Sequence, residues 1–307
     1  MKERVLVLGG KGFIGEYLVA KMSKLNRYEI IVADKQVDRK MVIDKVTFLP
    51  LEFSEKTDFS KYLKNIDTVI HLISTIFPDE NTDFIEKSII DNTFPTLNLL
   101  RTMVKTNCKK IVFASSGGTI YGNHNNVAIS EKEAGYPISN YGIVKDMIEK
   151  YIFLFSYYYG IDYRIIRMSN PYSSRSIAGR KQGLIPILIE KIKNGDTIQI
   201  WGNGENVRDY IYIDDAIEAI IRIMECSGSQ KVFNVGTGIG YSTNEIINIL
   251  CSHMGVNTPK IEYTASRKCD VDNNILDITY LKNLLKFKPK YSLEDGIQEV
   301  LHNFNRK

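Results

Sequence analysis

The sequence predicts an α/β protein with a doubly wound parallel sheet and a smaller C-terminal α/β region. Three observations lead to this fold class. Short apolar strands recur along the chain, helical segments separate them, and a glycine-rich turn joins the first strand to the first helix. Strands that are apolar almost without interruption are buried on both faces, as in parallel sheets covered by helices. In such sheets, ligands bind beyond the carboxyl ends of the strands.

The elements follow one another in the order that this fold requires. Predicted strands occupy residues 4–10, 29–34, 46–53, 67–74, 109–116 and 163–169. Predicted helices occupy residues 14–25, about 83–106 and 141 to about 159. After Asn170 the alternation becomes less regular, with glycine and proline punctuation. One further strand at 231–238 is a candidate to return to the sheet.

Composition and charge exclude several classes of protein. The chain has 307 residues, of which 44% are hydrophobic and 25% charged, as in globular proteins. A net charge of +4 without a dense Lys/Arg block does not suit a nucleic-acid partner. No apolar run reaches the roughly 18 residues of a membrane span, and the start runs directly into a strand without room for a signal peptide. We therefore expect a cytoplasmic protein with no membrane partner.

The cysteines predict neither disulfides nor a metal site. They are Cys108, Cys226, Cys251 and Cys269. None has CxxC spacing or a histidine at ligand spacing, so we expect reduced thiols and no bound metal.

The turn at residues 9–18, GGKGFIGEYL, predicts a dinucleotide site. Gly9, Gly12 and Gly15 form a G-x-x-G-x-x-G pattern between a strand and a helix. Such glycines allow a tight turn, close backbone approach to a pyrophosphate, and close helix–strand packing. Asp34 ends the second strand about 20 residues after the last of them, where an acid accepts hydrogen bonds from ribose hydroxyls and repels a 2′-phosphate. This favours NAD over NADP, although Lys35 follows directly.

A tyrosine and a lysine four residues apart form a candidate catalytic pair. Tyr141 and Lys145 lie in NYGIVKDM, on a predicted helix, where residues at this spacing share one face. Many helices carry such a pair without a catalytic role. The pair indicates catalysis only together with the dinucleotide site that precedes it in the chain.

Six segments in the expected order resemble the extended short-chain dehydrogenase/reductases. They are GGKGFIG, Asp34, SSGGTIYG, YGIVK, RMSNPY and VRDYIYIDD. More narrowly, the chain is similar to the nucleotide-sugar epimerase/dehydratase group, closest to its UDP-glucose 4-epimerase-like members. The resemblance spans essentially the whole chain. It implies a Rossmann NAD-binding domain over 1–169, with a substrate-binding region drawn mostly from 170–307, and it leaves open whether about 208–238 returns to the first domain.

The resemblance also implies roles for individual residues. Cofactor contacts are implied for Gly9, Gly12, Phe13, Ile14, Gly15, Asp34, Lys35, Glu52, Phe53, Leu72, Asn92, Tyr141 and Lys145, with Asn92 at the head of its helix. Substrate contacts are implied for Ser116, Thr119, Tyr141, Asn170, Leu184, Ile185, Gln199, Ile200, Trp201, Arg208, Arg267, Asp270 and Asn274. The two arginines are expected to hold the diphosphate of a UDP-sugar.

The implied reaction is epimerisation at C4 of a UDP-hexose through a 4-keto sugar. Tyr141 acts as acid and base, and Lys145 together with a positive nicotinamide ring favours its phenolate. Gly117 replaces a serine that is frequent in the family, so Ser116 or Thr119 is expected to supply a hydroxyl at O4.

Alternative functions stay open to different degrees. Related 4,6-dehydratases carry Asp-Glu, and decarboxylases a glutamate, where this chain has Gly117-Gly118. A 4-ketoreductase needs only the Tyr–Lys pair, and a sensor or scaffold that binds NAD usually lacks it. Asn274 replaces a bulky tyrosine of epimerases restricted to plain hexoses, which predicts that UDP-GlcNAc is accepted as well. The resemblance implies that the aromatic stretch 151–159 is partly core and partly a homodimer face, and we expect His71 to be a packed strand residue.

Overall fold

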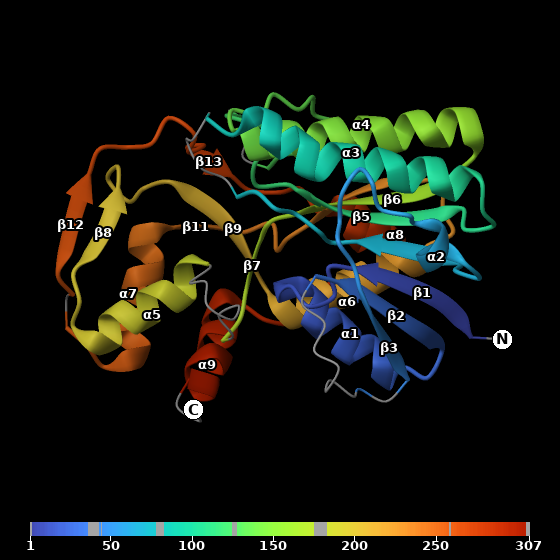
Figure 1. Cartoon of the computed structure of the whole chain (residues 1–307). Helices are drawn as coiled ribbons and strands as arrows, with labels where there is room; N and C mark the ends of the chain where they lie inside the picture. Colours follow the sequence, from blue (N-terminus) through green and yellow to red (C-terminus); the bar gives the residue numbers. More distant parts are fainter. Residues whose placement is uncertain are drawn as a thin grey trace. The chain divides into compact units, whose positions relative to one another are not determined.

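A mostly parallel β-sheet forms the centre of the fold in the computed structural model (Figure 1). The structure describes residues 2–35, 43, 45–77, 83–124, 128–174, 183–257 and 259–304. Within these residues, the sheet contains β1 (Glu3–Leu8), β2 (Tyr28–Asp34), β3 (Val46–Pro50), β4 (Thr68–His71), β5 (Lys110–Ser116), β6 (Asp162–Met168) and β10 (Val232–Val235). Their order is β10-β6-β5-β4-β1-β2-β3. The predicted doubly wound α/β fold is therefore confirmed, and the segment 231–238 does contribute a strand to the sheet.

The strand order reverses between β1 and β4. The chain runs outward from β1 through β2 to β3, all in parallel register, and then crosses back to place β4 on the other side of β1. This reversal is the switch point at which doubly wound sheets bind their ligands. Gly9 follows β1 and Leu72 follows β4, and the Leu72 N–H donates to the Leu8 carbonyl at 3.0 Å. The predicted phosphate turn thus lies at the switch point.

Helices cover both faces of the sheet. They are α1 (Phe13–Lys24), α2 (Ser60–Leu63), α3 (Ile85–Val104), α4 (Asn140–Tyr159) and α6 (Ile213–Glu225). In Figure 1, α3 and α4 lie side by side on one face and α1 lies on the other. The helices predicted from hydrophobic periodicity agree with α1, α3 and α4 to within two residues at each end.

Helix α4 carries the candidate catalytic pair and is defined at both ends. The Ser139 side chain accepts a hydrogen bond from the Gly142 N–H at 3.2 Å, which caps the helix N-terminus. Gly160 ends the helix with a φ of +69°. Val144 and Ile148 are buried on the face that meets the sheet core, so the register of this face is set by apolar packing.

The chain forms two compact units. The first consists of Met1–Ser116, Ser139–Arg167 and Ile220–Phe233, and the second of Gly117–Ile138, Met168–Ala219 and Asn234–Lys307. Each unit is therefore assembled from separate stretches of the chain. The predicted division at residue 169 stays a prediction about functional domains.

The second unit contains smaller sheets and several helices. Its elements are β7 (Asn170–Tyr172), α5 (Leu184–Asn194), β8 (Ile198–Trp201), β9 (Val207–Tyr212), β11 (Gly240–Ser242), α7 (Thr243–Met254), β12 (Ile261–Thr264), β13 (Asn273–Asn274), α8 (Thr279–Leu285) and α9 (Leu293–Phe304). Strand β9 pairs with β7, β11 and β13, and β8 pairs with β12.

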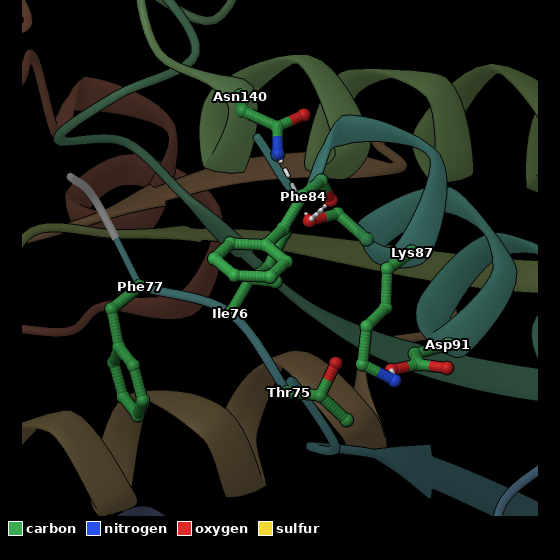
Figure 2. Close-up of a pocket in the computed structure, with 8 residues that line it drawn as sticks. Thr75, Ile76, Phe77, Phe84, Lys87, Asp91 and Asn140 are labelled. Carbon is green, nitrogen blue, oxygen red and sulfur yellow. Dashed lines mark hydrogen bonds and ion pairs between the residues drawn. The ribbon is translucent and has the colours of Figure 1, made fainter. Parts of the chain in front are cut away.

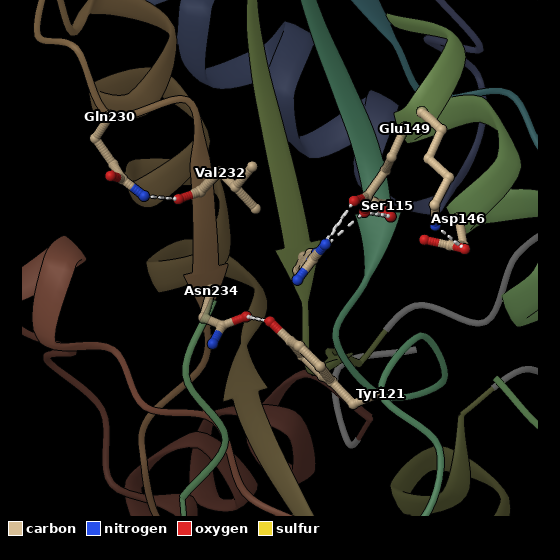
Figure 3. Close-up of polar contacts among 9 residues, drawn as sticks. Ser115, Tyr121, Asp146, Glu149, Gln230, Val232 and Asn234 are labelled. Atoms are coloured by element: carbon tan, nitrogen blue, oxygen red, sulfur yellow. Dashed lines mark hydrogen bonds and ion pairs between the residues drawn. The ribbon is translucent and has the colours of Figure 1, made fainter. Parts of the chain in front are cut away.

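Buried amide contacts hold separate stretches of the second unit together. The Tyr121 hydroxyl donates to Asn234 Oδ1 at 2.7 Å (Figure 3). The Asn234 amide nitrogen in turn donates to the carbonyls of Ile129 and Asp277 at 2.8 and 3.1 Å. Because Asn234 is fully buried, these bonds satisfy a side chain that would otherwise be costly to bury.

No helix among the residues that the structure describes is both long and apolar enough to cross a membrane.

Candidate active site

The turn between β1 and α1 has the geometry of a phosphate-binding loop. Gly9 has a φ of +81°, a conformation that favours glycine. A Cβ at Gly15 would lie 2.4 Å from the Gly9 carbonyl oxygen and 2.6 Å from Gly10 Cα, so the helix approaches the turn too closely for any side chain. Gly12 begins α1 without a side-chain cap, which leaves the N–H groups of the first helical turn, from Phe13 on, directed at the crevice. These features fit a dinucleotide pyrophosphate.

Asp34 lies beside this turn at the carboxyl end of β2. Its Oδ2 accepts a hydrogen bond from the Lys11 N–H at 2.9 Å, which ties the acid to the glycine turn. The Lys11 ammonium pairs with Glu16 at 2.8 Å, and Lys35 is exposed. A carboxylate in this position suits ribose hydroxyls and repels a 2′-phosphate.

The residues after β3 pack against the sheet. Glu52 is exposed, and the Phe53 ring lies 5.2 Å from the imidazole of His71 and 5.9 Å from the ring of Phe59. The Phe53 side chain is therefore partly occupied by packing against these two rings.

Asn92 is buried two turns inside α3, which begins at Ile85, so its expected place at the head of the helix is wrong. Its Oδ1 accepts from the Thr75 N–H at 2.9 Å, and its Nδ2 donates to the Thr75 hydroxyl at 2.7 Å and to the Ser88 carbonyl at 2.8 Å. Asn92 thus positions the segment that follows β4. Sequence periodicity placed the helix but could not reveal this contact.

The candidate catalytic pair lies at the start of α4, with Ser116 at the end of β5. The Ser116 side chain forms a hydrogen bond with Tyr141. The Lys145 ammonium is buried, donates to the Ala114 carbonyl at 2.8 Å, and lies 5.7 Å from the centre of the Tyr141 ring. The tertiary structure therefore brings together three of the predicted residues, Tyr141, Lys145 and Ser116, from β5 and α4.

Burial has the largest effect on the pKa values of both Tyr141 and Lys145. It raises the pKa of the Tyr141 phenol to about 12, and the hydrogen bond with Ser116 lowers that pKa in part. Burial lowers the pKa of Lys145 to about 8, whereas the Glu149 carboxylate raises it. The expected lowering of the Tyr141 pKa by Lys145 is therefore not seen in the protein alone, because desolvation is the stronger effect and the ammonium is engaged by a backbone carbonyl.

His71 is packed inside the sheet, between β1 and β5 in the strand order. The imidazole is buried, its Nε2 lies 3.0 Å from the Thr96 hydroxyl, and the Phe113 ring lies 5.3 Å away. Burial, together with the nearby Lys145 charge, lowers its pKa to about 3, so the imidazole is neutral at physiological pH.

A cavity of about 210 Å³ lies beside the start of α4 (Figure 2). It is lined by Thr75, Ile76, Phe77, Phe84, Lys87, Ser88, Asp91 and Asn140. The Asn140 amide donates to the Ser88 hydroxyl at 2.9 Å, which joins α4 to α3 directly before Tyr141. Sequence reasoning did not identify these residues, because apart from Asn140 they belong to a segment with no recognisable motif.

Four predicted substrate residues gather in the second unit. The Arg267 guanidinium lies 4.2 Å from the centre of the Trp201 ring. It also forms a two-point ion pair with Asp270, at 2.9 and 2.7 Å. Burial lowers the pKa of Arg208, and the carboxylate of Asp270 raises it. The two arginines and the acid therefore belong to one electrostatic cluster beside an exposed indole.

The other predicted substrate residues are distributed over neighbouring elements of the same unit. Asn170 begins β7, and its amide donates to the Asp209 carbonyl at 2.9 Å. Gln199 and Ile200 lie on β8, where Gln199 is exposed and Ile200 is buried. At the start of α5, Leu184 is partly exposed and Ile185 is fully buried, so of these two only Leu184 presents side-chain surface.

Asn274 contacts the glycine that replaces the family's serine. Its side chain is 1% exposed, and its Nδ2 donates to the Gly117 carbonyl at 3.0 Å. Because a carbonyl only accepts, this bond fixes the orientation of the amide. Among the described residues, Asn274 Oδ1 is then a buried acceptor without a hydrogen-bond partner. Thr119 is partly buried in the turn that follows Gly117.

Comparison with known proteins agrees with this geometry. The model of the NAD dependent epimerase/dehydratase family matches residues 5–236, more than two thirds of the chain. The chain is 33% identical to a UDP-glucose 4-epimerase of Thermotoga maritima solved with UDP-glucose, with a TM-score of 0.90 and 99% of each chain covered.

Two further relatives carry different activities. The chain is 31% identical over 314 residues to a dTDP-4-dehydro-6-deoxyglucose reductase of Escherichia coli, which covers 100% of this chain and 99% of that protein. It is 28% identical to a UDP-N-acetylglucosamine 4-epimerase of Methanobrevibacter ruminantium M1, solved with UDP-N-acetylmuramic acid, with a TM-score of 0.88 and 100% and 99% of the chains covered. Since the family model and the fold agree with the glycine turn and the Tyr–Lys pair, the chain belongs to the NAD-dependent epimerase/dehydratase family and is an enzyme with NAD as its cofactor.

Proposed function

We propose that this enzyme epimerises a UDP-hexose at C4 through a 4-keto sugar. The observation that carries the proposal is the hydrogen-bonded Ser116–Tyr141 pair beside Lys145, followed directly by Gly117-Gly118. This set can move a proton to and from a hydroxyl. It lacks the carboxylates with which related dehydratases and decarboxylases carry out elimination or loss of CO₂. The identity of 33% to a UDP-glucose 4-epimerase supports the same reaction.

A bound NAD⁺ would supply the reversible hydride chemistry at C4 and the positive charge of a nicotinamide ring. Tyr141 takes the proton of the 4-hydroxyl as the sugar is oxidised and gives it back after the sugar has turned. Ser116 donates to the phenolate and shares the proton during the transfer. Because the reaction has no net oxidation, the enzyme needs no second substrate.

The pKa of Tyr141 sets how much stabilisation the phenolate requires. With a pKa of about 12, deprotonation at pH 7 costs about 7 kcal/mol. The Lys145 ammonium lies 5.7 Å from the centre of the Tyr141 ring, and a cation at such a distance contributes about 3 kcal/mol at an effective dielectric constant of 20. Lys145 alone is therefore insufficient, which is why we expect the phenol to act only in the complex with NAD.

The cluster of Trp201, Arg208 and Arg267 is suited to hold a nucleoside diphosphate. A sugar that turns over between oxidation and reduction must stay anchored through its nucleotide. Arg267 is oriented by the Trp201 ring and by Asp270, so its guanidinium is ordered before a phosphate arrives. Two-point hydrogen bonding by arginine then suits a diphosphate.

Asn274 supports acceptance of N-acetylated hexoses. Its side chain is shorter than the tyrosine of epimerases restricted to plain hexoses. We therefore propose that both UDP-Glc and UDP-GlcNAc are substrates.

The test uses purified enzyme without added cofactor. Incubation with UDP-Glc and, separately, with UDP-GlcNAc should produce the galacto epimers, seen as new anomeric protons by NMR. Turnover without added NAD would mean that the enzyme keeps NAD bound during purification. If neither substrate changes even after NAD is added, the proposed reaction is wrong.

The sugar preference has its own variant and control. Asn274→Tyr should reduce turnover of UDP-GlcNAc at least tenfold more than turnover of UDP-Glc, an effect of about 1.4 kcal/mol. Asn273→Tyr, on the opposite face of β13, should leave the ratio unchanged, since neighbouring strand residues point to opposite faces. Full UDP-GlcNAc activity in Asn274→Tyr contradicts the assignment.

A 4-ketoreductase is the second candidate, favoured by the relative from Escherichia coli. Such an enzyme requires a 4-keto sugar nucleotide and a reduced nicotinamide cofactor. The assay follows the absorbance of the reduced cofactor after a dTDP-4-keto-6-deoxyhexose is added. A fall in this absorbance, in an enzyme that does not epimerise UDP-hexoses, would identify a 4-ketoreductase.

We also propose that the enzyme is a homodimer through α3 and α4. Large apolar side chains are exposed along both helices, among them Phe94 on α3 and Phe153 and Tyr157 on α4. Large apolar side chains exposed together on neighbouring helices are typical of interaction sites. Light scattering should give twice the mass of one chain, and Phe153→Lys should shift the mass toward the monomer.

A further inference from the structure

A buried carboxylate lies one helical turn after Lys145 and has no part in the chemistry described so far. Glu149 is 5% exposed, and its side chain accepts a hydrogen bond from the Ser115 hydroxyl on β5 (Figure 3). Arg167 on β6 donates to the same carboxylate. Its Nη2 donates to Oε2 at 2.8 Å, and its Nε lies 3.2 Å from both carboxylate oxygens. Glu149 is thus held by two strands of the sheet.

Stability alone is a weak explanation for this ion pair. Removing two charges from water is costly, and a buried pair often contributes less to stability than apolar residues of similar size. Glu149 and Arg167 nevertheless occupy the helix–sheet interface, where Val144 and Ile148 pack in the apolar core. A buried pair in such a place calls for a second role.

The surroundings of Lys145 supply that role. The ammonium meets the Ala114 carbonyl on β5 at 2.8 Å and the face of Phe113 at 4.8 Å. Among the residues that the structure describes, the titratable groups near it are His71 on β4, which is neutral, Tyr141 and Glu149 on its own helix, and Arg167 on β6, which is paired with Glu149. The carboxylate of Glu149 is therefore the anion that opposes the loss of the Lys145 proton through burial.

We propose that Glu149 is a positioning residue that keeps Lys145 protonated beside Tyr141, and that Ser115 and Arg167 hold its carboxylate in place. The inference rests on the proposed function to the extent that the Lys145 cation assists Tyr141. Without Glu149, Lys145 would lose its charge within the physiological pH range, and with it the attraction that favours the phenolate.

The experiment follows the ionisation of Lys145 directly. Protein with ¹³C at lysine Cε is titrated by NMR, and the Lys145 resonance is identified by its loss in Lys145→Met. In the wild type the midpoint should lie at about pH 8. In Glu149→Gln it should fall by about one pH unit, since the opposite charge one helical turn away has been removed.

A matched control removes a carboxylate that lies next to Lys145 in sequence but is turned away from it. Asp146 pairs with Lys150 on the exposed side of α4. Asp146→Asn should therefore leave the midpoint at about pH 8. The conservative variant Glu149→Asp keeps the negative charge, so the midpoint of the Lys145 titration should stay closer to that of the wild type than to that of Glu149→Gln. An unchanged midpoint in Glu149→Gln overturns the proposal.

A second variant keeps the experiment decisive if the first one does not fold. If Glu149→Gln fails to fold because Arg167 is left without its counter-ion, the double variant Glu149→Gln/Arg167→Gln removes both charges. It should show a smaller fall in the midpoint, because losing the Arg167 cation offsets part of the effect of losing the carboxylate. A midpoint at about pH 8 in the folded double variant also overturns the proposal.

Activity provides the second readout and separates the two proposals. The alkaline limb of kcat should move to lower pH in Glu149→Gln, in parallel with the NMR midpoint. A midpoint that shifts in a protein that never epimerises UDP-hexoses refutes the proposed reaction and leaves the role of Glu149 intact. An active wild type whose variant shows no shift refutes the role of Glu149 alone.

Discussion

Replacing Gly15 by alanine tests the phosphate loop most directly. The added Cβ would lie 2.4 Å from the Gly9 carbonyl oxygen and 2.6 and 2.7 Å from the Cα and carbonyl carbon of Gly10. Ordinary contacts of a carbon atom begin roughly 1 Å further out. Because all three neighbours are backbone atoms, α1 or the turn must move by about 1 Å to accept one methyl group.

The magnitude follows from this overlap. Overpacking by one methyl group in a tightly packed place costs about 1–3 kcal/mol, which corresponds to a fall in Tm of about 2–6 °C for a chain of this length. The displacement also moves the N–H groups of the first turn of α1. Losing one hydrogen bond to a charged phosphate, worth about 1.5–3 kcal/mol, weakens NAD binding about 10- to 100-fold.

The assay combines thermal unfolding, followed by circular dichroism, with calorimetric titration of NAD into protein freed of retained nucleotide. Gly228→Ala is the control, because its Cβ would meet only Cys226 Sγ at an ordinary 3.5 Å. The control should match the wild type in both measurements. The reasoning is refuted if Gly15→Ala binds NAD as tightly as the control does.

Three further outcomes are expected. Tyr141→Phe should lower kcat about 10²- to 10⁴-fold with little change in NAD affinity; a smaller loss in steady-state rates would exclude it as the acid/base. Trp201→Leu removes the ring on which Arg267 stacks at 4.2 Å, so UDP affinity measured by calorimetry should fall about two- to fivefold, as for an exposed cation–π contact of 0.5–1 kcal/mol; unchanged affinity contradicts the stacking role. Burial lowers the pKa of His71 from 6.5 to about 3, so in this window the unfolded chain binds a proton that the folded protein does not. Stability should therefore fall as the pH falls, and urea unfolding at pH 6.5 and 5.0 should show about 2 kcal/mol less loss in His71→Gln than in the wild type. Equal losses would show that His71 is not the responsible group.

Residues close in sequence were predicted well. The glycine turn, Asp34 and the Tyr141–Lys145 pair each depend on spacing within one strand, turn or helix, so their local geometry follows from periodicity and backbone conformation. The place of Asn92 at the head of its helix came from the family resemblance and was wrong, although the start of α3 was itself predicted to within two residues. The residues that line the cavity beside Asn140 were not predicted, because apart from Asn140 they belong to no recognisable motif.

The ionisation states of buried groups could not be predicted from the sequence. The expectation was that Lys145 and a bound nicotinamide ring together favour the Tyr141 phenolate, whereas in the protein alone burial raises the pKa of Tyr141 to about 12. How deeply a group is buried depends on every segment packed around it, and desolvation can exceed the effect of a neighbouring charge.

The sequence by itself determined the strand–helix alternation, the nucleotide turn and the presence of a Tyr–Lys pair, because these are patterns of adjacent or regularly spaced residues. Only the tertiary structure decided that Ser116 from β5 meets Tyr141, that Asn274 binds the carbonyl of Gly117, and that Glu149 is held by Ser115 and Arg167 from two different strands. These contacts join residues far apart in the chain. Their geometry arises when apolar faces pack together and bring polar groups into a common, poorly solvated space, where each must find a partner.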